Sequence, residues 1–122
     1  MKIAVYGKAF PIEARPYVEG LYKRLKGENM ELAIFSRLDR FLRENCSWEE
    51  EYPIFETHQE LQNFNPDFLI TIGGDGTILD AVTVVRNSGI PILGINTGRL
   101  GFLANVAKEE INSAINGLIA GK

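Results

Sequence analysis

The sequence predicts an α/β fold with a doubly wound, mostly parallel sheet, and three observations lead to this prediction. Short apolar runs occur at 3–6, 31–35 and 68–72, and they are rich in the residue types that strands favour. Between the runs, apolar residues recur at the spacing of one helical face. Runs and helical segments alternate along the chain, and this alternation is typical of parallel strands joined by helices.

The first half of the chain is expected to form two strand–helix pairs. The strand at 3–6 precedes a helix over 14–25, where apolar residues are three and four positions apart. The strand at 31–35 leads into a short helix, and Ser36 is predicted to cap the N-terminus of that helix. A loop follows over 45–56, because three glutamates and a proline interrupt its apolar residues, and a short extended piece is expected at 54–56.

The middle of the chain carries a helix-start signal before its most apolar strand. Thr57 and Glu60 match a capping box, which predicts a short helix, and His58 in its first turn is expected to lie at the surface. The run at 68–72 (FLITI) is apolar and β-branched, so it predicts a buried strand.

The C-terminal part is expected to continue the alternation. Apolar spacing predicts a helix over 78–85 that Gly89 closes, then a strand at 90–95 and a last helix over 111–119. With 122 residues, the chain is long enough for one compact domain, so 1–122 is predicted to be a single α/β domain.

Composition excludes several classes of protein. A net charge of -3 argues against a nucleic-acid-binding protein, which usually has a basic face. The single cysteine, Cys46, permits neither an internal disulfide nor a cysteine-based zinc site, and this fits a cytoplasmic location. No apolar run is long enough to span a membrane, so we expect neither nucleic acid nor membrane as a partner.

Three loops are candidates for a binding site, because ligands of doubly wound sheets bind at the carboxyl ends of the strands. They lie at 7–10, 73–77 and 96–101. The second, GGDGT, is the most informative, since its glycines allow close backbone approach and the helix after it attracts phosphate. Asp75 would repel a phosphate, so it is expected to meet a metal ion or a hydroxyl group, as in phosphoryl transfer. The alternative is that Asp75 only caps the helix.

Two blocks resemble the NAD kinase family. They are GGDGT at 73–77, continued by TILDA at 77–81, and GINTGRLGFLA at 94–104. GGDGT alone is also found in diacylglycerol and sphingosine kinases, and a close variant in phosphofructokinases, but the two blocks together are much more specific. The resemblance implies a Rossmann-like, phosphofructokinase-like N-terminal domain. The second, β-rich domain of the family is absent, so we expect an N-terminal domain truncated near residue 122.

The resemblance also implies an activity. NAD kinases transfer the γ-phosphate of ATP to the 2′-hydroxyl of the adenosine ribose of NAD, which forms NADP. ATP, NAD and Mg²⁺ or another divalent cation are therefore the implied ligands, with the metal held mainly by the ATP phosphates. The family also suggests a homo-oligomer, and the isolated fragment is expected to have little or no kinase activity.

The roles of individual residues follow from their match to the family. Asp75 matches the catalytic aspartate that accepts the proton of the ribose hydroxyl. Gly76 matches a backbone contact to NAD, while Gly73, Gly74 and Thr77 would line the phosphate side with its bound Mg²⁺.

Other matches lie outside the glycine loop. Leu79, Leu100 and Phe102 match apolar positions that border the adenosine, although core packing is an equal alternative for Leu79. Arg99 is expected to reach a phosphate, with a solvated arginine as the alternative.

Two charged residues need separate mention. Lys8 follows the first strand and is a further candidate to approach the triphosphate. Asp80 departs from the family, because many members carry a basic residue there, and an acid cannot bind phosphate directly.

Three other functions remain open from the sequence. A lipid kinase that shares GGDGT would need a membrane-facing patch, and none is evident. A sugar-phosphate kinase of the phosphofructokinase type fits the block at 94–104 poorly. A nucleotide-binding module without turnover is the third.

Overall fold

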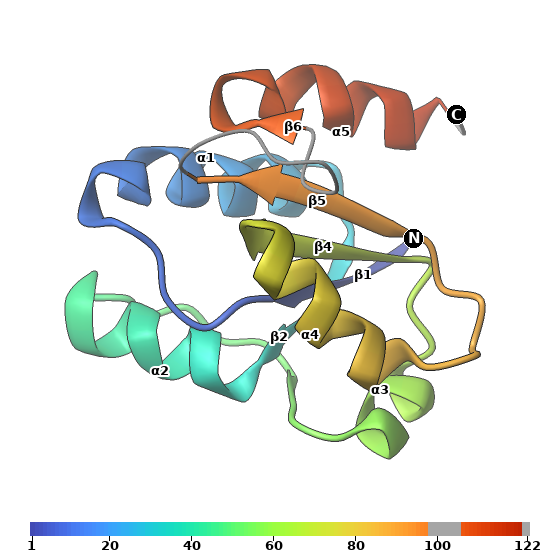
Figure 1. Ribbon diagram of the computed structural model, residues 1–122. Coiled ribbons are helices and arrows are strands. Elements are labelled where there is room, and N and C mark those ends of the chain that lie inside the picture. Colours follow the sequence, from blue (N-terminus) through green and yellow to red (C-terminus); the bar gives the residue numbers. More distant parts are fainter. Residues whose placement is uncertain (98–105, 121–122) are drawn as a thin grey trace.

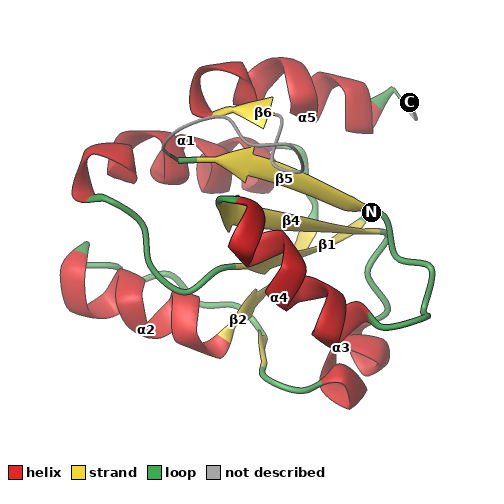
Figure 2. Ribbon diagram, in the orientation of Figure 1, coloured by secondary structure: helices red, strands yellow, loops and turns green. Residues whose placement is uncertain are grey.

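The computed structural model describes residues 1–97 and 106–120, which form a sheet covered by helices on both faces (Figures 1 and 2). The strands are β1 (Lys2–Tyr6), β2 (Glu31–Phe35), β3 (Ile54–Phe55), β4 (Phe68–Gly73), β5 (Ile92–Asn96) and β6 (Val106–Ala107). The helices are α1 (Arg15–Gly27), α2 (Ser36–Asn45), α3 (His58–Phe64), α4 (Asp75–Val85) and α5 (Ile111–Ile119). Short 3-10 turns, η1 (Ile12–Ala14) and η2 (Lys108–Glu110), precede α1 and α5.

The strand order is β3-β2-β1-β4-β5-β6, and every described pair of neighbouring strands is parallel. The chain therefore starts in the middle, moves outward to β3, returns to β4 beside β1 and then moves outward on the other side. Where β1 meets β4, Tyr6 pairs with Thr71. This is the switch point at which doubly wound sheets bind their ligands. The predicted fold class is confirmed.

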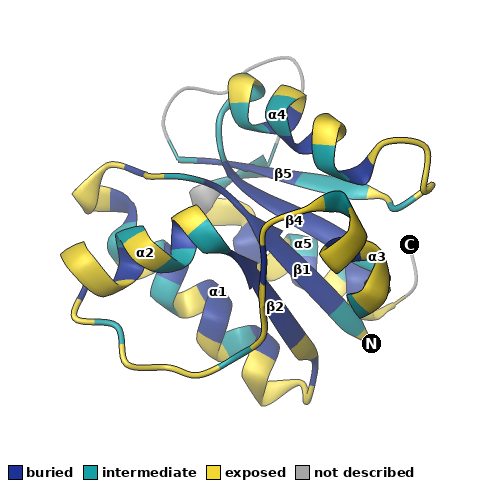
Figure 3. Cartoon of the chain, turned by 90° about the horizontal axis from the view of Figure 1, so that it is seen from below, coloured by how far each residue is buried: buried dark blue, intermediate teal, exposed yellow. Residues whose placement is uncertain are grey.

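Two groups of buried side chains hold the helices on the sheet. Residues from α1, α2 and α5 pack on one face, and residues from α3 and α4 pack on the other. In Figure 1 α5 lies alongside α1, and α3 and α4 lie on the opposite side of the sheet. Figure 3 shows the central strands as almost continuously buried, which is typical of a parallel sheet covered on both faces.

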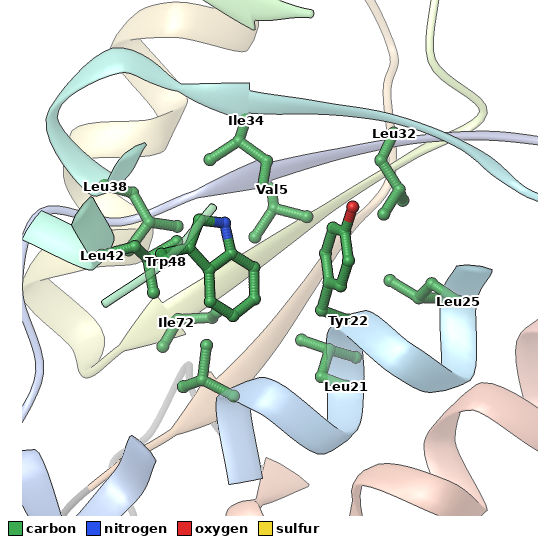
Figure 4. Close-up of a pocket in the computed structure, with 11 residues that line it drawn as sticks. Val5, Leu21, Tyr22, Leu25, Leu32, Ile34, Leu38, Leu42, Trp48 and Ile72 are labelled. Atoms are coloured by element: carbon green, nitrogen blue, oxygen red, sulfur yellow. The ribbon is translucent and has the colours of Figure 1, made fainter. Parts of the chain in front are cut away.

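A small cavity lies in the core between the sheet, α1 and α2 (Figure 4). Its volume is about 20 Å³, and the side chains around it include Val5, Leu21 and Ile72. Trp48 covers it from the segment after α2 and contacts the Tyr22 ring edge-on, with 4.9 Å between ring centroids. A void of this size has room for about one water molecule, so it is a packing defect of the core and not a ligand site.

The start of α2 differs from the prediction. Ser36 is the first residue of the helix and Phe35 occupies the N-cap position, without a side-chain hydrogen bond. The Ser36 hydroxyl instead donates a hydrogen bond to the Glu56 carboxylate at 3.1 Å. The prediction was wrong because β2 runs into α2 without a turn, so that the polar residue falls inside the helix.

The start of α3 is the capping box that the sequence predicts. The Glu60 N–H donates to Thr57 Oγ1 at 3.1 Å, and the Thr57 N–H donates to Glu60 Oε1 at 3.2 Å. His58 was expected to lie at the surface, and this expectation was wrong. His58 is half-buried, and its Nδ1 lies 2.5 Å from the Val84 carbonyl oxygen, which ties α3 to α4.

Candidate functional site

The glycine loop joins the end of β4 to the start of α4, at the switch point of the sheet. Gly73 is the last residue of β4, Gly74 is the N-cap of α4, and Asp75 is its first residue. Only the N-cap residue Gly74 lies between the strand and the helix. The N-terminus of α4 therefore points out at the carboxyl edge of the sheet.

Gly73 is required by the backbone of the loop itself. Its φ of +152° is a conformation that side chains rarely permit. A Cβ atom at this position would also lie 2.9 Å from Thr77 Cβ and closer still to the Thr77 hydroxyl. The loop thus folds back so tightly that Thr77 packs over Gly73.

Gly74 and Gly76, unlike Gly73, are not packed against other described atoms. A Cβ atom added at either position would meet no described atom within 4 Å outside its immediate neighbourhood. The space above them is therefore open to a ligand. The first N–H groups of a helix have no partner inside the helix, and they favour an anion. This arrangement suits a phosphate group.

Asp75 does not occupy the capping position, since that position belongs to Gly74. Gly74, and not Asp75, is therefore the N-cap residue of α4. Asp75 is half-buried, and as the first helical residue it places a carboxylate beside the N–H groups that favour an anion.

The second sequence block begins next to the glycine loop. Asn96, at the end of β5, pairs with Gly73 in the sheet, and the Thr97 N–H donates to the Gly73 carbonyl at 3.1 Å. Asn96 is only 2% exposed, which is unusual for an amide side chain. The sequence did not single it out, although a polar residue that ends an apolar strand is a usable signal. Arg99, Leu100 and Phe102 lie outside the described residues.

The loop after β1 forms the other wall of the switch point. A Cβ atom at Gly7 would lie 2.9 Å from the carbonyl oxygen of Ile72, so the two chains approach closely there. The Lys8 ammonium forms an ion pair with the Asp80 carboxylate on α4, with 2.9 Å between Nζ and Oδ2. Burial raises the pKa of the Tyr6 hydroxyl, and the nearby charge of Lys8 opposes this shift.

Leu79 lies on the outward side of α4. Its side chain is 60% exposed, and Val82, one turn further, is 48% exposed. Figure 3 shows the same side of α4 as largely exposed. Core packing is therefore not the role of Leu79, which leaves its side chain available to a ligand.

The carboxylates near the loop do not form a metal centre by themselves. Within 1–97 and 106–120, no group of three or more His, Cys, Asp or Glu residues could hold a metal ion. Mg²⁺ usually binds through one or two carboxylates together with the phosphates of a substrate. Asp75 is the one carboxylate in the loop, so the residues present fit a Mg²⁺ ion that the phosphates of a nucleotide carry.

The fold and the loop together define a class of protein. A parallel sheet wound in both directions, with a glycine-rich turn and a helix N-terminus at its switch point, is the architecture of many phosphate-binding α/β domains. A carboxylate in that turn adds a group able to orient a hydroxyl or a metal ion.

Comparison with known proteins identifies the family. Residues 14–122 match the family model described as the ATP-NAD kinase N-terminal domain, and the chain belongs to this family. It is 45% identical over 113 residues to the NAD kinase of Flavobacterium psychrophilum and 41% identical over 122 residues to that of Christiangramia forsetii. These matches cover 93% and 100% of this chain, but 38% and 41% of the relatives. The lipid and sugar-phosphate kinase alternatives are thereby disfavoured.

A solved structure supports the fold. The yeast NADH kinase in complex with NADH superposes with a TM-score of 0.75 and 22% identity over 98% of this chain and 38% of that one. At this identity the likeness concerns the fold alone. No helix in the described parts of the chain has the length and apolar character needed to cross a membrane.

Proposed function

We propose that this chain supplies the catalytic loop of an NAD kinase, which transfers the γ-phosphate of ATP to the 2′-hydroxyl of the adenosine ribose of NAD. The observation that carries the proposal is the build of the glycine loop. Gly73 is required by the fold, whereas Gly74 and Gly76 leave open space in front of a helix N-terminus. Open space directly in front of a helix N-terminus, beside a carboxylate, is suited to the phosphates of a ligand.

Each group in the loop has a task in this reaction. The N–H groups at the start of α4 hold the phosphates of the donor. Asp75 orients the ribose hydroxyl and accepts its proton. Because an ordinary aspartate has a pKa near ~3.9, it is a weak base, so orienting the nucleophile contributes more than early proton removal. Mg²⁺, bound through the ATP phosphates, would offset the charge that develops during transfer.

The acceptor is assigned from the second block and from the family. The described start of that block, up to Thr97, hydrogen-bonds to the glycine loop. Leu79, exposed on α4, offers an apolar surface for an adenine ring. Arg99, Leu100 and Phe102 complete the proposed contacts to the phosphate and the adenosine.

The isolated chain is proposed to be a half-site with little or no turnover. It spans 38–41% of the length of the relatives named above, and their remaining residues would complete the contacts to NAD. A homo-oligomer and a cytoplasmic location belong to the same proposal.

A chimera tests the proposal. In the Flavobacterium psychrophilum NAD kinase, the segment that matches this chain is replaced by residues 1–122 of this chain. The purified chimera is incubated with ATP, Mg²⁺ and NAD, and NADP is measured with an NADP-specific dehydrogenase. We expect NADP to form with NAD as acceptor, and no phosphorylation of diacylglycerol.

The isolated chain serves as the comparison in the same assay. We expect it to form NADP at less than about one hundredth of the rate of the chimera, given how strongly rates depend on the positioning of both reactants. NADP formation by the isolated chain at the rate of the chimera would contradict the half-site. A folded chimera that binds ATP without forming NADP would instead support a nucleotide-binding module.

A further inference from the structure

The ion pair between Lys8 and Asp80 bridges the two loops of the switch point. Lys8 comes from the loop after β1 and Asp80 from α4, and 2.9 Å separate Nζ from Oδ2. The Lys8 side chain is 39% exposed and that of Asp80 is 50% exposed. Ion pairs at this exposure contribute at most about 1 kcal/mol to stability, so the fold does not depend on the pair.

The backbone that carries Lys8 is anchored on both sides. Gly7 lies against the Ile72 carbonyl so closely that a side chain would not fit there. Phe10 is buried, with its ring edge-on to Phe41 at 4.8 Å between centroids. Lys8 therefore extends from a short segment with fixed ends, and its ammonium group has a limited range of positions.

The ion pair places the Lys8 ammonium group beside the first turns of α4. Asp80 follows Gly76 by four residues, so both lie on the same side of α4, one turn apart. Side chains on a helix tilt toward its N-terminus, so the Asp80 carboxylate is directed toward the turn that contains Gly76, although it stays more than 4 Å from the position of a Cβ atom there. Because the space above Gly76 is open, an anion in that space would lie beside the Lys8 ammonium.

We infer that Lys8 binds the phosphate chain of the donor, and that Asp80 is a positioning residue that holds the lysine at the mouth of the site. A triphosphate carries several negative charges and the carboxylate only one. The bound phosphate therefore competes with Asp80 for the ammonium group of Lys8. This inference rests on the proposed function, since it names the group that meets the phosphate donor.

Tripolyphosphate binding to the 122-residue chain tests the inference. Inorganic tripolyphosphate is titrated calorimetrically at low and at moderate ionic strength into the wild type, Lys8→Met, Lys8→Arg and Asp80→Asn. We expect Lys8→Met to weaken binding about tenfold and to make it less sensitive to salt, because one screened charge is lost. Lys8→Arg is expected to restore most of the affinity. Asp80→Asn removes both the group that positions Lys8 and a carboxylate that competes with the phosphate, so the test is the coupling of the two residues: Lys8→Met is expected to weaken binding less in the Asp80→Asn background than in the wild type.

Lys26→Met is the matched control, because it removes an exposed lysine on α1 and lowers the net charge equally. Thermal unfolding checks that every variant is folded. Equal weakening by Lys8→Met and Lys26→Met, or no binding by the wild type, would overturn the inference. If Lys8→Met weakens tripolyphosphate binding while the chimera forms no NADP, the anion site stands and the proposed acceptor is wrong.

Discussion

The glycines around the site differ in what they do for the molecule. Gly7 and Gly73 are packed against other atoms of the chain, and a side chain at either position would collide with them. Gly74 and Gly76 face open space. The first two are therefore needed for folding, and the last two are expected to be needed for ligand binding.

Replacing Gly73 or Gly76 by alanine should separate these two roles. Gly73→Ala puts a side chain at a positive φ and against Thr77, so it should lower the free energy of unfolding by about 1–3 kcal/mol. Gly76→Ala places a better helix former in the first turn of α4, so stability should stay equal or rise by up to about 1 kcal/mol. Denaturant unfolding measures both.

The binding measurement completes the comparison. Gly76→Ala should weaken tripolyphosphate binding despite its unchanged stability, because its methyl group fills the space meant for the ligand. A Gly76→Ala variant that binds like the wild type would contradict the assignment of that space to a phosphate.

At this scale the sequence predicted part of the site. The glycine loop and Asp75 were recognisable because their residue types and order are unusual. The partner of Asp80 was not, since Lys8 lies 72 positions away and only the sheet order brings the two together. The sequence indicated only that Asp80 cannot bind phosphate directly, and the structure places the Lys8 ammonium beside it.

Among the elements, α3 depends most on its N-terminal cap. It has seven residues, and isolated helices of that length are unstable in water. The capping box, the buried Leu61 and the His58 contact to Val84 hold it in place.

Thr57→Ala tests the contribution of this cap. The substitution removes the acceptor for the Glu60 N–H, so it should cost about 1 kcal/mol and lower the midpoint of thermal unfolding by about 4 °C. Thr83→Ala is the control, because the Thr83 hydroxyl is exposed and bonds only within α4. Its effect should remain below about 0.5 kcal/mol. Equal effects of the two substitutions would show that the cap contributes nothing specific.

The elements were predictable where periodicity was long. The spacing of apolar residues placed α1 and α5, and the β-branched run placed β4. Element ends were harder to predict. The helix expected over 78–85 does end at Val85, but it begins at Asp75, and Arg86 with a φ of 50° closes it in place of Gly89. The two-residue strand β6 was missed, because two residues show no alternation.

On the scale of the whole molecule, the strand order explains why distant segments form one site. The loops that follow β1, β4 and β5 lie at the same edge of the sheet, so residues near 8, 75 and 96 come together there. The alternation of strands and helices predicted the parallel sheet. The alternation did not predict the order of the strands across the sheet, and this order sets the switch point.

The central claim is that Asp75 acts on the acceptor hydroxyl, and Asp75→Asn in the chimera tests it most directly. Asp67→Asn is the matched control, because Asp67 precedes the same strand at its opposite end, where its carboxylate accepts a hydrogen bond from Lys2 N–H. We predict that Asp75→Asn lowers kcat for NADP formation by about 100-fold or more, with a small change in KM for NAD, and that Asp67→Asn retains kcat. A folded Asp75→Asn chimera with the kcat of the unmodified chimera would contradict the account.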